Sequence, residues 1–127
     1  MGNTVVILTY GADAPVVEGK FLQLIWRGRE HLLFSPRTRH LFHNEILGTF
    51  LAERRIDHHW LNDQTLHIDA DDLRIIGGGR FVADAGSRTL RLSDNSQAYG
   101  RFDENGLPEK IAAAESPWQT FSITIAG

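Results

Sequence analysis

Cysteine is absent from the 127 residues of this chain. That absence excludes thiolate nucleophiles, cysteine-ligated zinc fingers, iron–sulfur clusters and disulfide scaffolds from the possible functions. A chain of this length has the usual size of one domain and buries roughly two thirds of the surface that its unfolded form exposes. We therefore expect a single domain over residues 1–127 that needs neither disulfides nor a structural metal.

A charge excess and a long apolar run are also missing. The 13 basic and 16 acidic residues give a net charge of −3, so no global field draws the chain toward nucleic acid or an anionic membrane. No run reaches the roughly 18 apolar residues of a membrane span, and the first residues lack the basic segment of a secretory signal. We expect a cytoplasmic protein with no nucleic-acid or membrane partner, in which any anion site is built locally.

The apolar residues that are present follow two periodicities. Alternating and β-branched runs between turn residues predict strands at 4–9, 21–26, 31–34, 65–68, 73–76, 80–83, 89–93 and 120–125, whereas residues 56–60 are ambiguous. Residues 27–30 would close a hairpin. Ser35 as a cap and Pro36 as the first helical position predict one long helix, and a second is predicted at 108–115. Short connections and an excess of strands predict an α+β fold with a mixed or mostly antiparallel sheet and two helices.

Three consecutive glycines, Gly77, Gly78 and Gly79, follow the strand predicted at 73–76. Glycine loses much backbone entropy on folding and packs no side chain, so the three together indicate that a bare backbone is needed there. Two explanations are equally open: close approach to an oxyanion such as phosphate with Arg80 beside it, or a bulge or bend in a curved sheet. The spacing matches neither the dinucleotide-binding fingerprint nor the P-loop.

A second small and polar stretch, Asn-Ser-Gln-Ala-Tyr-Gly, occupies residues 95–100 at the end of a predicted strand. Consecutive backbone N–H groups in such a turn can point the same way and bind an anion. A plain turn explains the same residues and is the commoner case, so both interpretations stay open at this point.

His43 precedes Ile46, Leu47 and Phe50 at helical spacing, which places it on or beside a buried stripe. Burial could keep its imidazole neutral as a base, although histidines on apolar faces are more often simply packed and hydrogen-bonded. His40 lies close by, but the His-Glu-x-x-His pattern is missing and we expect no metal site. Histidines and acids at 58–72 and the scattered arginines predict solvated surface rather than calcium or RNA binding.

Taken together, Gly77-Gly78-Gly79-Arg80, Ser96-Gln97-Ala98-Tyr99-Gly100 and Phe42-His43-Asn44-Glu45-Ile46 resemble motifs of the small phosphohistidine phosphatases, the Janus/Ocnus family. The resemblance spans roughly residues 20–102 and is strongest at 73–100. It implies a compact α+β domain that hydrolyses phosphate from phosphohistidine in proteins or peptides, without a metal or another cofactor. We expect the chain to act as a monomer.

The resemblance also implies roles for individual residues. His43 falls on the catalytic histidine of the family. Ser96 falls on a position that binds phosphate through its hydroxyl and backbone, and Ala98 on one that binds through its N–H. Arg80 falls on the arginine of the glycine segment, which helps to organise the site.

Two neighbouring residues, Lys20 and Phe21, are candidates for the position of the family's phosphate-contacting lysine. Lys20, at the edge of the strand predicted at 21–26, matches it only if the alignment shifts by one residue, and otherwise Phe21 takes its place. A slip of one residue on a strand reverses the face that the side chain takes. Phe42 also stands where the family usually has tyrosine, and residues 52–72 are a longer segment than usual.

The mechanism that we expect is in-line attack of water on phosphorus, with neutral His43 as general base and local N–H groups and cations holding the phosphoryl oxygens. Direct phosphorylation of His43 in a covalent intermediate is an alternative. A non-catalytic module that binds a phosphorylated or other anionic partner through the same loops is the alternative function.

Overall fold

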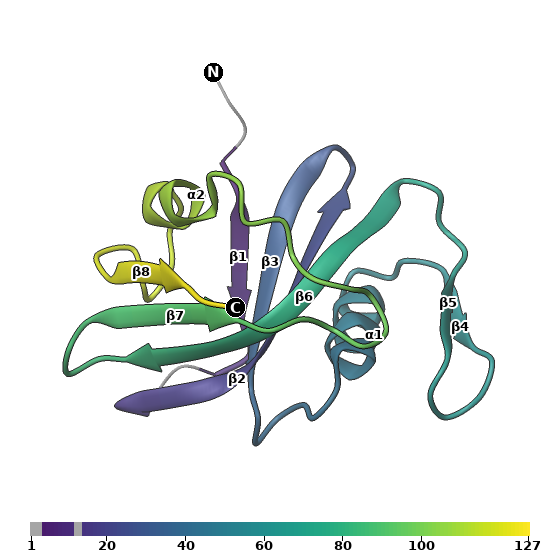
Figure 1. Ribbon diagram of the computed structural model, residues 1–127. Helices are drawn as coiled ribbons and strands as arrows, with labels where there is room; N and C mark the ends of the chain where they lie inside the picture. The colour runs from purple at the N-terminus through teal and green to yellow at the C-terminus, as the bar shows by residue number, and fades with distance from the viewer. Residues whose placement is uncertain (1–3, 12–13) are drawn as a thin grey trace.

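The computed structural model describes residues 4–11 and 14–127, and over these residues the chain forms eight strands and two helices (Figure 1). In chain order they are β1 (Val6–Thr9), β2 (Val16–Trp26), β3 (Arg29–Pro36), α1 (His43–Glu53), β4 (His58–Trp60), β5 (Leu66–Ile68), β6 (Leu73–Asp84), β7 (Thr89–Ser93), α2 (Leu107–Ala113) and β8 (Ser122–Ile125). The segments that the sequence predicts as strands all contain strand residues, and the ambiguous residues 56–60 contain β4. The strands predicted at 73–76 and 80–83, however, are one strand, β6, because the three glycines pair in the sheet instead of ending it. The described chain is a single compact α+β domain, as predicted.

Six of the described strands form one sheet in the order β1-β3-β2-β6-β7-β8, while β4 and β5 form a separate two-stranded ribbon. The inner pairs are antiparallel, whereas β1 and β8 at the edges run parallel to their neighbours. The predicted hairpin joins β2 to β3, and its residues Arg27 and Gly28 have φ of 53° and 75°. Positive φ at both positions is the turn geometry that matches the twist of paired strands. The sheet is therefore mixed and mostly antiparallel, as predicted.

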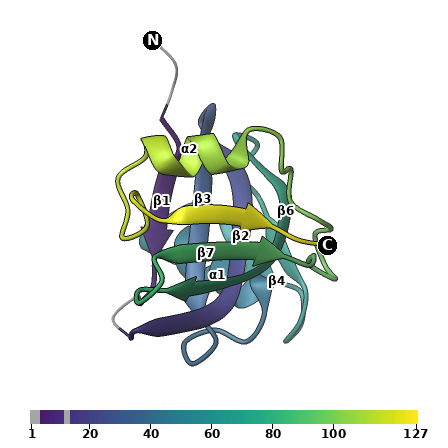
Figure 2. The same ribbon diagram turned by 60° about the vertical axis from the view of Figure 1, so that its left-hand side comes forward.

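The two faces of the sheet carry separate hydrophobic cores. Alternation along β2 sends Phe21 to one face and Leu22 to the other. The Phe21 face packs against α2 and the segment after it, and the Leu22 face packs against α1, so the helices cover different faces (Figures 1 and 2). Neither helix in the described part of the chain has the length and apolar character that crossing a membrane requires.

The first helix begins later than the sequence predicts. Ser35 still pairs with Lys20 in the sheet, and Pro36 is the last residue of β3. A turn follows, in which Arg39 and His40 donate their N–H groups to the Pro36 carbonyl, and α1 starts only at His43. The prediction of a helix from Ser35 and Pro36 is wrong because pairing with β2 is a long-range contact that a local cap signal cannot reveal. The later start makes His43 the first residue of the helix.

The second strand begins earlier than predicted, at Val16 rather than Phe21. Its first half pairs with β6 throughout and with β3 from Gly19 onward. It contains the polar residues Glu18 and Lys20 because only one of its faces is buried. Lys20 is therefore an internal residue of the strand, and the prediction that it lies at the edge is wrong.

Candidate functional site

A cavity of about 980 Å³ opens beside the first turn of α1. Five segments of the chain supply its walls: β2, β6, the start of α1, the turn between β4 and β5, and the loop after β7. The lining residues are Lys20, Phe42, His43, Asn44, Glu45, Asp63, Gln64, Arg80, Asp94, Asn95, Ser96, Gln97 and Ala98. All five side-chain and loop positions for which the sequence predicts a catalytic or phosphate-binding role line this one cavity.

His43 is buried, with 5% of its surface exposed, and its ring is oriented by one hydrogen bond. Its Nε2 lies 3.0 Å from the carbonyl oxygen of Gly79. A carbonyl oxygen only accepts, so Nε2 carries the proton and donates it, and in the neutral ring Nδ1 then holds the lone pair. Among the described residues Nδ1 has no hydrogen-bond partner. The packing thus leaves the basic nitrogen of His43 available.

The charge state of His43 follows from the same surroundings. Burial lowers its pKa from the usual 6.5, and the positive charges of Lys20 and Arg80 lower it further, against the opposing effects of the backbone carbonyls of Gly79 and Phe21. The imidazole is therefore neutral at neutral pH, which is the state that a general base requires.

The three glycines lie under the site and make room for other parts of the chain. A Cβ on Gly78 would stand 2.7 Å from His43 Cδ2 and 2.8 Å from the Phe21 carbonyl oxygen. Cβ atoms on Gly77 and Gly79, which face the other side, would collide with the Arg101–Phe102 segment. Between Gln23 and Leu24 the register with β6 shifts, so a bulge adjoins the glycines as one of the two explanations predicts. Gly78 itself is needed to seat the His43 ring.

Lys20 and Arg80 are paired across β2 and β6 and lie on the face that carries His43. Burial lowers the pKa of Lys20 and the neighbouring charge of Arg80 lowers it further, which shows that the two cations share one region. Arg80 is the more exposed and forms an ion pair with Asp94 at 3.3 Å. Phe21 is fully buried in the opposite core, so Lys20 is the residue that β2 presents to the cavity.

Residues 96–100 form a tight turn. Ser96 and Gly100 exchange two backbone hydrogen bonds of 3.0 and 2.9 Å, and the buried Ser96 hydroxyl accepts the Tyr99 N–H at 3.2 Å. The Ser96 N–H therefore already has an acceptor, the Gly100 carbonyl, and cannot donate to phosphate as predicted. Of the two predicted contacts of Ser96, only the one through the hydroxyl remains. Gln97 and Ala98 are exposed residues whose backbone N–H groups have no acceptor within the described part of the chain, so these two N–H groups are the donors left for an anion.

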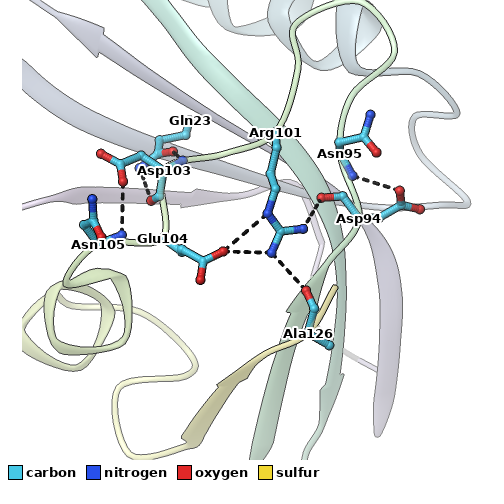
Figure 3. Close-up of polar contacts among 8 residues, drawn as sticks. All are labelled: Gln23, Asp94, Asn95, Arg101, Asp103, Glu104, Asn105 and Ala126. Carbon is cyan, nitrogen blue, oxygen red and sulfur yellow. Dashed lines mark hydrogen bonds and ion pairs between the residues drawn. The ribbon is translucent and has the colours of Figure 1, made fainter.

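Arg101 holds the base of this turn in place (Figure 3). Its guanidinium donates to the carbonyl oxygens of Asp94 and Ala126, both at 3.0 Å, and pairs with Glu104 at 2.9 Å. These contacts tie the loop after β7 to the end of β8 and to the segment before α2. The loop therefore meets the cavity in a defined position although it contains no regular structure.

The remaining histidines lie outside the cavity. His40 bonds to Ser35 at 2.6 Å and Thr49 at 2.9 Å, and His59 and His67 share Asp69 on the surface of the ribbon. Across residues 4–11 and 14–127, no group of three or more His, Asp or Glu side chains is arranged to hold a metal ion.

Sequence reasoning missed one wall of the cavity. The turn between β4 and β5 brings Asp63 and Gln64 to it, where the Gln64 carbonyl accepts a 2.7 Å hydrogen bond from the Asn44 side chain. Asn62 closes that turn through two bonds to backbone N–H groups. Its turn chemistry was a visible signal, but nothing local indicated that the turn would fold back onto α1.

No protein-family model matches this chain, and a search of curated proteins finds no significant match either. What the site does is therefore inferred from its geometry and from the motifs in the sequence.

Proposed function

We propose that this protein is a phosphohistidine phosphatase, which hydrolyses the P–N bond of phosphohistidine in proteins or peptides with His43 as general base. One observation carries the proposal. The hydrogen bond from His43 Nε2 to Gly79 leaves the basic Nδ1 free beside a cavity that also contains Lys20, Arg80 and the donors of the 96–98 turn. A neutral base and a set of anion-binding groups are what hydrolysis of a phosphoryl group needs.

In this mechanism the phosphoryl oxygens lie against the N–H groups of Gln97 and Ala98, the Ser96 hydroxyl and the two cations. Water attacks phosphorus in line with the P–N bond, and His43 Nδ1 takes the proton that the water loses. Phosphoryl transfer requires little covalent work from the protein, so positioning and charge stabilisation supply most of the rate. The rigid anchoring of the turn by Arg101 serves that positioning.

The leaving nitrogen takes the electron pair of the broken P–N bond. A phosphohistidine ring can carry a proton on its second nitrogen, as imidazole does in its charged form, and then departs as neutral imidazole. The proton balance closes without a donor from the protein: His43 becomes protonated and the products are inorganic phosphate and the free histidine side chain.

The test is an assay of phosphohistidine-peptide hydrolysis without added metal, in which the release of inorganic phosphate is measured. We expect His43→Gln to lower kcat/KM by about 10²- to 10⁴-fold, the usual contribution of a general base. Glutamine can keep an N–H donor near Gly79 and lacks the basic nitrogen, so it removes the base with little change in packing. His67→Ala, on the exposed surface of the ribbon, is the matched control and should retain full activity.

Each other outcome has a defined meaning. Undiminished turnover by a folded His43→Gln variant would overturn the assignment of the base. Peptide binding by the wild-type protein without turnover would instead support the alternative function, a module that binds phosphorylated or anionic partners. A phosphorylated chain trapped by alkaline quenching would show that His43 acts as a nucleophile through a covalent intermediate.

A further inference from the structure

Phe42 is a large apolar side chain that the fold leaves exposed at the mouth of a mainly polar cavity. It is 59% exposed, although it lies directly before the buried His43. Removing an exposed aromatic ring from water is favourable, so a ligand that covers the ring binds more tightly. The exposed Phe42 ring is therefore a surface that a ligand in the cavity could cover.

The structure of the helix does not account for this residue. Phe42 is the N-cap of α1, where Ser, Thr, Asp and Asn are preferred because their side chains accept a backbone N–H. Glu45 supplies the capping contacts instead, since its carboxylate accepts the N–H groups of Leu41 and Phe42 at 2.9 and 3.1 Å. The ring contributes neither a cap nor a buried contact to the core.

The ring is close to the groups that would hold phosphate. The Lys20 ammonium lies over it, 5.3 Å from the ring centroid. A phosphoryl group between Lys20 and His43 would therefore place its leaving group within reach of Phe42. The leaving group of phosphohistidine is a planar aromatic imidazole. The leaving group of phospholysine is an aliphatic amine, and that of phosphoramidate is ammonia.

We propose that Phe42 is a specificity-determining residue of this site, on whose exposed ring the imidazole of a phosphohistidine substrate stacks, so that aromatic phosphoramidates are preferred to aliphatic ones. This inference rests on the proposed function and specifies its substrate class. Aromatic pairs in offset or edge-to-face arrangements gain energy beyond the area they bury, and aliphatic amines lack the π face that this requires.

The experiment compares kcat/KM for a phosphohistidine peptide, a phospholysine peptide of the same sequence, and phosphoramidate. Wild-type protein should prefer the phosphohistidine peptide. Phe42→Leu, which keeps an apolar side chain of similar size, should lower kcat/KM for that peptide about two- to tenfold more than for the other two substrates. Phe42→Tyr should keep the wild-type preference. Leu41→Ala is the matched control, because Leu41 is equally exposed (56%) but does not line the cavity.

An equal loss on all three substrates, or no loss on any, would overturn the role of Phe42 while leaving the phosphatase proposal intact. Absence of turnover of all three by the wild-type protein would overturn the phosphatase proposal and this inference with it. Thermal unfolding of each variant separates a change in specificity from a change in folding.

Discussion

His40 and His43 are both buried, lie three positions apart, and have lowered pKa values for the same first reason, burial of the ring. Their hydrogen bonds differ. Both ring nitrogens of His40 have partners, Ser35 and Thr49, which join the end of β3 to α1. For His43 the described residues provide one well-formed hydrogen bond, from Nε2 to the Gly79 carbonyl.

That difference separates a structural histidine from a reactive one. A ring whose two nitrogens are both bonded to protein groups holds the fold together and has no lone pair to offer. A ring that is held by one nitrogen is oriented as firmly, yet keeps the other nitrogen for chemistry. Burial or a lowered pKa alone would not have distinguished the two.

The sharpest way to break the comparison is to displace the His43 ring without changing it. In Gly78→Ala the new Cβ would stand 2.8 Å from both His43 Nε2 and the Phe21 carbonyl oxygen. Because the carbonyl belongs to the sheet, the ring must give way and its bond to Gly79 is lost. We expect kcat/KM for a phosphohistidine peptide to fall about 100-fold, since small misplacements of catalytic groups are costly.

Gly86→Ala is the control for that variant, because its Cβ would meet only the flexible Asp84 side chain, at 3.3 Å. Overpacking at Gly78 should also lower the free energy of unfolding by about 1–3 kcal/mol, which chemical denaturation measures. Full activity in a folded Gly78→Ala protein would show that the position of the His43 ring does not matter for catalysis.

A pH series tests whether His43 works as the neutral base. Its pKa lies below 6.5, so kcat/KM should be constant around pH 7 and fall about tenfold per pH unit once the pH drops below that pKa. Lys20→Gln removes a positive charge that lowers this pKa, and should move the acid limb to higher pH. NMR titration of the His43 ring measures the shift without substrate; a ring that titrates above 6.5 would contradict the argument.

The smallest effect on activity is expected for His40→Leu. Loss of its two hydrogen bonds leaves Ser35 and Thr49 unsatisfied and should lower the free energy of unfolding by about 1–3 kcal/mol, with kcat close to that of the wild type. The wild type should also lose stability as the pH falls below 6.5, because the unfolded chain binds protons that buried, neutral histidines do not. In His40→Leu the free energy of unfolding should depend less steeply on pH below 6.5. A large loss of kcat would instead give His40 a part in the site.

Local patterns predicted the strands well, because hydrophobic alternation and turn residues are read from neighbours in sequence. They placed the start of α1 at Pro36 and the start of β2 at Phe21, and both errors concern residues whose state depends on pairing between β2, β3 and β6. Of the site, His43, Lys20, Arg80, Ser96 and Ala98 were predicted from motifs. The wall formed by Asp63 and Gln64 was not, because it depends on how the ribbon packs on α1.

The sequence by itself determined the α+β class, the absence of thiol chemistry, and the presence of a histidine on the buried side of a helix, since these follow from composition and periodicity. Only the tertiary structure decided which nitrogen of His43 is free and which N–H groups remain for an anion. The first depends on a partner distant in the chain, Gly79 for His43. The second depends on the turn in which the Ser96 N–H bonds to Gly100, and the Gly100 carbonyl also accepts the N–H of Gly78, from the distant strand β6. Hydrogen bonds between distant segments exist only once the chain has folded, and they set the chemistry of this site.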